Sequence, residues 1–433
     1  MALGGSASDL LKLRAQAVEL FREGVAASDP ESAVASALRA RMDTIAAARR
    51  VILVAFGKAA CTMARAALPF VGDKLQTACV VTNRENLVEV PGVEVIAGGH
   101  PLPDEGSVRG ADAIESAARS ATPGDLLLVL VSGGGSALTC APVPGVSLAD
   151  KIALNQALIR SGADITEVNA VRQKFSRLKG GRLAQLASGA KVLSLFLSDV
   201  PGDDVATIAS GPTAKPVTCA ADATAILERY DLLGTLPPTL CAYFNGSAAR
   251  AEPDAACFDH VENVVIGSNA ISLQRVMSSA GSQYAVVVKA DDWLDGDVSE
   301  AAAMLHRLTV SAARRAPVAI VAGGEPTVRV RGSGRGGRNQ ELALRFALLN
   351  ERTSIRRPWV FLSGGTDGRD GPTDAAGGLV DAGSTSWMRQ LGCSPERCLN
   401  NNDSYHALAL SGDLLMTGPT GTNVADLQIL LMQ

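Results

Sequence analysis

The sequence lacks the features that mark membrane and secreted proteins. Its longest apolar segment of note, Leu126–Val131, is far shorter than the roughly 20 residues that cross a bilayer. The N-terminal segment contains Asp9 and Glu19 and has no apolar signal core. We therefore expect a cytoplasmic protein with no membrane partner.

The sequence also lacks an excess of basic charge, a cysteine framework and a metal-binding histidine pattern. Its 40 lysines and arginines stand against 44 aspartates and glutamates, so we expect no nucleic-acid partner. Its eight cysteines contain no CxxC pair, and its four histidines have no metal-binding spacing, which argues against a disulfide scaffold and structural zinc. No GxSxG motif is present, which excludes an α/β-hydrolase triad.

Glycine, in contrast, is abundant, with 43 residues among 433, and it clusters behind short apolar runs. Continuous rather than alternating apolar runs are typical of strands buried on both faces of a parallel sheet. The runs lie at 51–60, 78–83, 126–137, 192–199, 263–269, 283–291, 318–325, 359–368 and 413–421. Helical spacing predicts helices over 147–160 and 164–187, and a helical segment near 221–233.

These patterns predict an α/β fold. The length suggests two domains of roughly 200 residues each, and the stretch 212–262 lacks a strong strand signal. We place the boundary inside that stretch, giving domains 1–240 and 241–433. In sheets of this kind ligands bind at the carboxyl ends of the strands, where the glycine clusters fall.

Gly133, Gly134 and Gly135 follow the most apolar run and precede Ser136. Backbone N–H groups in such a loop can bind a phosphate or carboxylate, although a tight turn also uses glycine. The three glycines exceed what a turn needs, so we favour an anion site.

Several polar residues stand near other predicted strand ends. Lys58 follows the first strand in FGKAA, which lacks the full Walker pattern; it is either a phosphate ligand or an ordinary exposed lysine. One face of a helix over 164–187 would carry Asn169, Arg172, Ser176 and Lys179. An ordinary solvent-exposed helix face would show the same pattern.

Carboxylates follow the strand at 192–199. Asp199 comes directly after that strand, where a Mg²⁺ ligand of a phosphoryl-transfer site is expected. Asp203 and Asp204 lie in the next turn, and turns favour aspartate for reasons of their own.

The segment 331–341 is the richest in functional side chains. Gly332, Gly334 and Gly337 satisfy GxGxxG between a strand-like TVRVR and a helix-like segment, which is the context of a dinucleotide site. Its three arginines, and the lack of an acidic residue about 20 positions later, argue instead for a phosphoryl group or a phosphorylated ligand. Segments 364–378 and 416–427 add a second rim of carboxylate and hydroxyl groups.

The ordered set of motifs resembles the glycerate 2-kinase family, whose C-terminal part is the MOFRL domain, from about residue 10 to the end. One departure follows Arg172, where the family has a basic residue and a histidine and this chain has Gln173 and Lys174. The motifs are FGKAA, GGHPLPDEGS, VSGGGSA, VNAVRQKFSRLKGGRLA, SDVPGDDVATIASGPT, GRGGRNQELAL, GTDGRDGPTDAAGG and TGPTGTNVADL.

The resemblance implies ATP-dependent phosphorylation of D-glycerate at its 2-hydroxyl, giving 2-phosphoglycerate and ADP. It implies a Rossmann-like N-terminal domain with a mostly parallel sheet, a C-terminal MOFRL α/β domain and an active site in the cleft between them. ATP and Mg²⁺ would be the cofactors, in a cytoplasmic monomer or homodimer.

With that resemblance, the candidate residues take roles by position. We assign catalysis to Lys58, Arg338 and Asp199, and substrate binding to Asn169, Arg172 and Lys179. The candidate metal ligands are Asp199, Asp204 and Asp367. The candidate phosphate-binding residues are Gly133, Gly134, Gly135, Ser136, Gly334, Gly336 and Gly337.

Two alternatives remain from other classes. An NAD(P)H-dependent hydroxypyruvate reductase would use the GxGxxG at 332–337 as a dinucleotide site. A non-catalytic regulator that binds a sugar phosphate would leave the clustered aspartates without a purpose.

Overall fold

Two separate β-sheets organise the chain. The computed structural model describes residues 7–187, 189–216, 220–245, 253–290, 293–315, 317–353, 355 and 357–433. Its backbone contacts divide into two units. We call Pro30–Ile266 the parallel-sheet unit, and Met1–Asp29 together with Gly267–Gln433 the mixed-sheet unit.

The sheet of the parallel-sheet unit has the strand order β3-β2-β1-β4-β5-β6. Pairings among the first five strands of this order are all parallel, which confirms the predicted mostly parallel sheet. The strands are β1 (Val51–Phe56), β2 (Leu75–Asn83), β3 (Glu94–Gly98), β4 (Leu126–Val131), β5 (Lys191–Ser198) and β6 (Val261–Ser268).

Strands β1 and β4 are buried along their whole length, as continuous apolar runs predict. Alternate side chains of the sheet pack against helices on its two faces. One face is covered by α2 (Pro30–Arg39), α3 (Met42–Ala47) and α4 (Ala60–Val71), and the other by α5 (Glu105–Arg119), α6 (Gly135–Leu138) and α9 (Arg182–Leu186).

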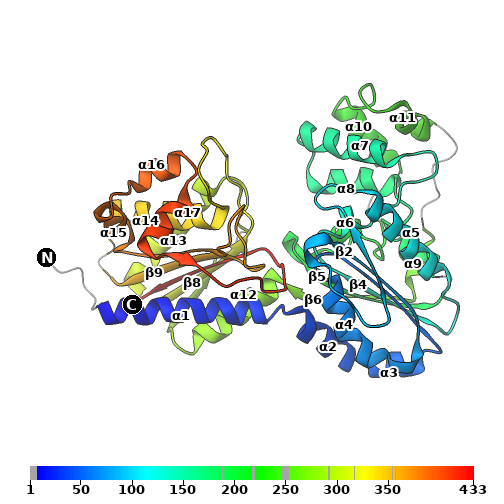
Figure 1. Cartoon of the computed structure of the whole chain (residues 1–433), viewed down its shortest axis with the longest axis horizontal. Coiled ribbons are helices and arrows are strands. Elements are labelled where there is room, and N and C mark those ends of the chain that lie inside the picture. Colours follow the sequence, from blue (N-terminus) through cyan, green and yellow to red (C-terminus); the bar gives the residue numbers. More distant parts are fainter. Residues whose placement is uncertain are drawn as a thin grey trace. The chain divides into compact units, whose positions relative to one another are not determined.

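Four further helices form a smaller apolar cluster at one end of this unit (Figure 1). They are α7 (Leu148–Ser161), α8 (Ile165–Lys174), α10 (Ala220–Arg229) and α11 (Pro238–Asn245). The predicted capping box of Ser147 and Asp150 starts α7, and Asp164 with Glu167 starts α8 in the same way. These capping boxes fix the residues at which α7 and α8 begin.

The prediction of one helix over 164–187 is wrong. Helix α8 ends at Lys174, because the following backbone pairs with the segment at 141–143 instead of continuing helical hydrogen bonds. Gly180 and Gly181 then adopt φ values of 60° and 77°, which glycine tolerates, and α9 starts only at Arg182.

The sheet of the mixed-sheet unit has the strand order β11-β10-β9-β12-β8-β7. Only β7 and β8 pair in parallel among its described pairings, and the others are antiparallel. The strands are β7 (Val286–Lys289), β8 (Val318–Gly324), β9 (Trp359–Gly365), β10 (Gly377–Asp381), β11 (Leu414–Leu415) and β12 (Asp426–Met432). Strands β3, β10 and the central β12 were not predicted from the sequence.

Helices cover both faces of this sheet (Figure 1). Helices α1 (Ala7–Ala26) and α12 (Asn269–Gly281) pack on one face. The other face carries α13 (Val298–Ala312), α14 (Arg338–Thr353), α15 (Ser384–Gln390), α16 (Pro395–Asn400) and α17 (Ser404–Ser411). No helix in the described part of the chain is both long and apolar enough to cross a membrane.

The N-terminal helix α1 belongs to the mixed-sheet unit, although the proposed boundary near 240 places it with the parallel sheet. Its apolar stripe, which includes Phe21, packs against β9 and β12. Arg14 adds ion pairs to Asp381 at 2.7 Å and Asp413 at 2.7 Å. The compact units therefore divide the chain at 29/30 and 266/267 instead of once.

We expect Phe21→Ala to destabilise the mixed-sheet unit by about 3 kcal/mol, because it leaves a cavity at a fully buried position. All three tryptophans, Trp293, Trp359 and Trp387, lie in that unit, so their fluorescence during urea unfolding reports on it. Leu11→Ala, on the exposed side of the same helix, is the control. An unchanged midpoint in Phe21→Ala would contradict this packing of α1.

Candidate active site

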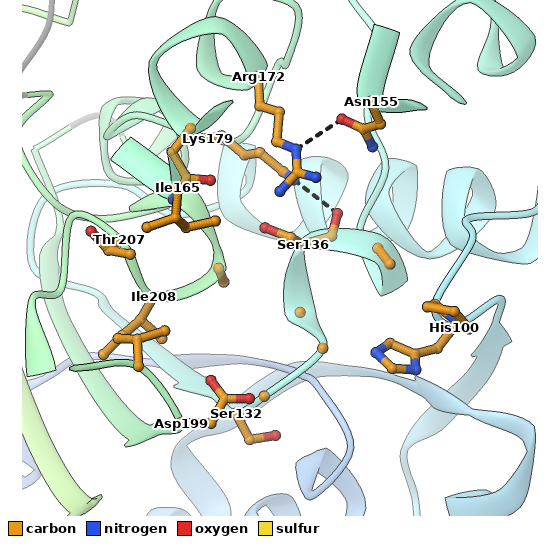
Figure 2. A pocket seen from close by; sticks show the side chains of 18 residues that line it. His100, Ser132, Ser136, Asn155, Ile165, Arg172, Lys179, Asp199, Thr207 and Ile208 are labelled. Carbon is orange, nitrogen blue, oxygen red and sulfur yellow. Dashed lines mark hydrogen bonds between the residues drawn. The ribbon is translucent and has the colours of Figure 1, made fainter. Parts of the chain in front are cut away.

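A cavity of about 260 Å³ lies at the carboxyl ends of β4 and β5 in the parallel-sheet unit (Figure 2). Helices α7 and α8 provide its other wall. This is the position expected for a ligand site in a parallel α/β sheet. The lining residues are His100, Pro101, Ser132, Gly133, Gly134, Gly135, Ser136, Ala137, Asn155, Ile165, Asn169, Arg172, Lys179, Asp199, Val200, Thr207, Ile208 and Ala209.

The loops after β1 and β4 interlock, because the two strands end in register at Phe56 and Val131. The Ser132 hydroxyl accepts a hydrogen bond from the Ala59 N–H at 3.0 Å, and the Lys58 N–H donates to the Gly133 carbonyl at 2.9 Å. Gly57 has φ 124°, and a Cβ there would lie 2.2 Å from the Ser132 hydroxyl oxygen. Only glycine permits this approach.

The glycine loop 133–135 keeps backbone donors available to a ligand. The N–H groups of Gly133 and Gly134 donate no hydrogen bond within the described structure. Gly134 has φ 81°, and a Cβ there would lie 2.9 Å from the His100 ring and 3.5 Å from the Lys58 Cγ. These two N–H groups and the nearby Lys58 can together receive an anion, as the sequence predicts.

His100 faces the cavity beside this loop (Figure 2). Burial lowers the pKa of its imidazole, and the neighbouring Lys58 lowers it further, while Glu85 acts in the opposite direction. The ring is therefore neutral near pH 7 and can donate one hydrogen bond and accept another.

Ser136, Ser210 and Asn169 form a hydrogen-bonded chain along the wall. The two serine hydroxyls are 2.8 Å apart, and that of Ser210 donates to Asn169 Oδ1 at 2.9 Å. Ser210 has φ 62° and Ala209 φ 50°, a left-handed conformation that costs energy for residues other than glycine. The surrounding network holds this turn against the cavity.

The same wall carries Arg172 and Lys179, as predicted, although not from one helix. The Arg172 guanidinium donates from Nε to Asn155 Oδ1 at 2.8 Å, and Lys179 Nζ donates to the Ser136 carbonyl at 2.8 Å (Figure 2). Burial lowers the pKa of both groups. No carboxylate in the described residues forms an ion pair with either, so the wall is suited to an anionic ligand.

Sequence reasoning missed Lys151, which lies behind this wall on α7. Its Nζ donates to the Arg172 carbonyl at 3.2 Å, and its side chain is only 4% exposed. Nothing in the local pattern distinguishes this lysine from the exposed lysines of other amphipathic helices.

Asp199 lies across the cavity from Arg172 and Lys179, next to Ser132 (Figure 2). Burial raises the pKa of its carboxyl, whereas Lys58 lowers it. The predicted metal candidate Asp204 is not among the lining residues, and its carboxylate accepts hydrogen bonds from the Ala206 N–H and the Thr207 hydroxyl within a turn.

No group of three or more potential metal-binding side chains gathers in the described part of the chain. Mg²⁺ in nucleotide sites is commonly held by one or two carboxylates together with phosphate oxygens. The single carboxylate of Asp199 fits that ligand set, whereas a metal held by protein side chains alone does not.

The remaining predicted residues belong to the mixed-sheet unit. Arg338, at the start of α14, donates from Nε and Nη2 to the two oxygens of the buried Asp426, at 2.6 and 2.9 Å. Its Nη1 forms an ion pair with the half-exposed Glu325 at 2.8 Å. Asp426 thus fixes the direction of this guanidinium, and it too was absent from the sequence-based candidates.

The loop 331–335 uses its backbone donors internally. The N–H groups of Arg331 and Gly332 donate to Asn402 Oδ1, and that of Gly334 donates to the Asn401 carbonyl. A Cβ on Gly332 or Gly334 would collide with the backbone of Asn401. The glycines at 332 and 334 therefore allow two chain segments to pack closely.

The N-terminus of α14 is occupied by Asp370. Its carboxylate accepts hydrogen bonds from the N–H groups of Asn339 and Gln340, at 3.1 and 2.8 Å. A dinucleotide pyrophosphate would need those donors. The predicted strand TVRVR is also absent, so 332–337 is not a dinucleotide-binding loop in this structure.

Gly336 and Gly337 also belong to close packing. A Cβ on Gly337 would lie 2.2 Å from the Asp370 carboxyl carbon, and one on Gly336 would lie 2.2 Å from the Ser404 hydroxyl oxygen. Asp367, the third metal candidate, accepts a hydrogen bond from the Arg369 N–H in the turn after β9.

Two family models match the chain. Residues 16–245 match a domain of unknown function, DUF4147, and residues 318–426 match the MOFRL family.

Full-length relatives agree with these matches. A D-glycerate 2-kinase from Thermotoga maritima is 38% identical over 432 residues, covering 96% of this chain and 98% of that protein. A protein from Agrobacterium vitis with the provisional name hydroxypyruvate reductase is 38% identical, over 95% of this chain and 93% of its own. The crystal structure of a glycerate kinase from Thermotoga maritima has a TM-score of 0.87 and 36% identity, covering 98% of this chain and all of that one.

We expect Asp426→Asn to destabilise the mixed-sheet unit by about 2 kcal/mol, because it removes a charged acceptor from two hydrogen bonds of Arg338. The midpoint of urea unfolding, followed by tryptophan fluorescence, measures this loss. Glu325→Gln alters the exposed partner of the same arginine, and its cost should stay below about 1 kcal/mol. Equal losses in the two variants would mean that Asp426 does not hold Arg338.

Proposed function

Because the chain belongs to the glycerate 2-kinase family, we propose that it transfers the γ-phosphoryl group of ATP to the 2-hydroxyl of D-glycerate, giving 2-phosphoglycerate and ADP. The observation that carries this proposal is the cavity of the parallel-sheet unit. In the described part of the chain it combines backbone donors without a partner at Gly133 and Gly134, basic side chains without an ion pair at Arg172 and Lys179, and one carboxylate at Asp199.

Glycerate would bind through its carboxylate to the cationic wall. The planar guanidinium of Arg172 can bind a carboxylate through two parallel hydrogen bonds, and Asn155 already holds it in place. Asn169 and the hydroxyl of Ser136 can orient the hydroxyl groups of the substrate. Such contacts fix the reacting 2-hydroxyl before transfer.

Phosphoryl transfer depends on positioning and on charge neutralisation more than on covalent chemistry. Lys58 would stabilise the negative charge on the oxygens of the phosphoryl group during its transfer. Its side chain lies beside Gly134, and its charge acts on both Asp199 and His100. The N–H groups of Gly133 and Gly134 would bind a phosphate oxygen. Arg338 would contact the phosphoryl group through its Nη1, which pairs with Glu325 in this structure.

Asp199 would hold Mg²⁺ through one carboxylate oxygen, with the nucleotide phosphates completing the ligand set. The ion, when bound, would neutralise charge on the phosphates. Asp204 is less suited to this role, because both of its carboxylate oxygens already accept hydrogen bonds within its own turn.

A hydroxypyruvate reductase is the second candidate, because the provisional name of one relative suggests it. Its nicotinamide cofactor would need the donors of the loop 331–335 and of the α14 N-terminus. Asn401, Asn402 and Asp370 occupy those donors. The kinase is therefore the better supported function.

Phosphorus NMR of the purified protein with ATP, Mg²⁺ and D-glycerate tests the proposal. We expect a growing 2-phosphoglycerate signal. A 3-phosphoglycerate signal would keep the kinase and overturn the choice of hydroxyl. No transfer, combined with NADH oxidation in the presence of hydroxypyruvate, would replace the kinase by the reductase.

We expect Lys58→Ala to lower kcat at least 100-fold, since losing one group that stabilises transition-state charge costs about 3 kcal/mol. Lys58→Arg should retain part of this activity. Lys12→Ala, at an exposed position of α1, is the control for loss of a lysine as such. Near-normal turnover of Lys58→Ala would remove Lys58 from the mechanism.

A further inference from the structure

Three basic side chains lie together at the wall of the cavity, and within the described residues no carboxylate forms an ion pair with them. Arg172 and Lys179 line the cavity, and Lys151 lies directly behind them. Lys151 is 4% exposed and Lys179 is 6% exposed. Buried lysines are usually paired with carboxylates, yet neither lysine forms an ion pair within the described residues.

The hydrogen bonds of the two lysines leave much of their donor capacity unused. Each ammonium group has three donors, but Lys179 Nζ reaches only the Ser136 carbonyl and Lys151 Nζ only the Arg172 carbonyl among the described partners. Lys151 also lies over the Phe175 ring, 5.9 Å from its centroid. A buried ammonium in such surroundings is costly until an anion arrives.

The groups around Lys179 come from four elements, and none is a carboxylate. Lys151 faces it from α7, Arg172 from α8 and Cys140 from the segment after α6. Arg182 of α9 donates to the Lys179 carbonyl at 3.1 Å. Asp199 lies on the far side of the cavity, where its charged neighbour is Lys58.

These surroundings disfavour three simultaneous positive charges. Burial lowers the pKa of Lys151 to about 8. Burial lowers the pKa of Lys179 well below its ordinary value, and repulsion from Lys151 and Arg172 lowers it further. Without a ligand, the burial and crowding of the three groups therefore favour the neutral amine of a lysine over a third positive charge.

We propose that an anion bound against Arg172 is accompanied by a proton that Lys179 takes up from solvent, and that Lys151 is a positioning residue that controls this uptake through its charge. The amine of Lys179 becomes an ammonium ion, while the carboxylate of the ligand stays ionised. The naming of glycerate as the anion rests on the proposed function; the proton coupling does not.

The physical basis is the attraction between the incoming charge and the lysine. An anion within a few ångströms favours the protonated form of Lys179, and by linkage the protonated form binds the anion more tightly. The affinity for the anion should therefore fall several-fold as the pH rises from 7 to 9. Glycerate and sulfate, neither of which titrates between pH 7 and 9, should both show the effect.

Isothermal titration calorimetry of the full-length protein tests this coupling. D-glycerate, and separately sulfate, would be titrated at pH 8 in buffers that differ in ionisation enthalpy. The dependence of the observed heat on that enthalpy gives the number of protons taken up. We expect net uptake; zero uptake or proton release overturns the proposal, as does the absence of binding by both anions.

Variants assign the proton to its site. Lys179→Met should abolish uptake and weaken binding, whereas Lys151→Met should reduce uptake at pH 8 because Lys179 is then already protonated in the free protein. Lys151→Arg keeps the charge and should restore uptake. Lys215→Met, at an exposed position of the same unit, is the control. Unchanged uptake in Lys179→Met would contradict the assignment.

The NMR assay separates this proposal from the function on which its substrate depends. Phosphoryl transfer without proton uptake would overturn the coupling and leave the kinase intact. Proton uptake on anion binding without phosphoryl transfer would support the coupling and overturn the kinase.

Discussion

The close approach of two strand ends determines the geometry of the cavity. Strands β1 and β4 end in register, and the chain after each must leave the sheet through the same small space. Gly57 makes this possible, because any Cβ at that position would collide with Ser132. The resulting hydrogen bonds, Ala59 to Ser132 and Lys58 to Gly133, fix both loops relative to the sheet. Lys58 consequently lies beside the glycine loop, in which the N–H groups of Gly133 and Gly134 have no partner in the described structure.

Above these two fixed loops, the basic wall of the cavity and the carboxylate of Asp199 lie on opposite sides. Arg172 and Lys179 occupy one wall of the cavity, while Asp199 lies on the other side, where its charged neighbour is Lys58. A substrate carboxylate would need cations, whereas a Mg²⁺ ion would need a carboxylate, so the proposed kinase would benefit from keeping the cationic wall apart from Asp199. The helical cluster supplies the cationic wall because its capping boxes and apolar core hold α7 and α8 in place.

The sequence predicts the central strands β1, β4 and β5 of the parallel sheet well, because they are buried on both faces and appear as uninterrupted apolar runs, whereas the partly exposed β3 was missed. It fails at β12, whose apolar residues follow a glycine- and threonine-rich segment that suggests only a loop. It also fails at the end of α8, because the alternative pairing with 141–143 is a long-range interaction. The structure nevertheless brings Arg172 and Lys179 to the wall of one cavity, although they do not lie on one helix as predicted. Lys151 and Asp426 could not be found, since their importance depends on neighbours that only the fold supplies.

The two glycine-rich loops show why a motif of letters does not identify a ligand site. In the loop 331–335 the backbone N–H groups are satisfied by Asn401, Asn402 and Asp403, and its glycines allow that contact. In the loop 133–135 two consecutive N–H groups have no partner in the described structure, and cationic side chains stand nearby. Buried backbone donors are rarely left unsatisfied without cause. The proposed anion site in this protein therefore rests on the distribution of unsatisfied donors in the described structure and not on the spacing of glycines.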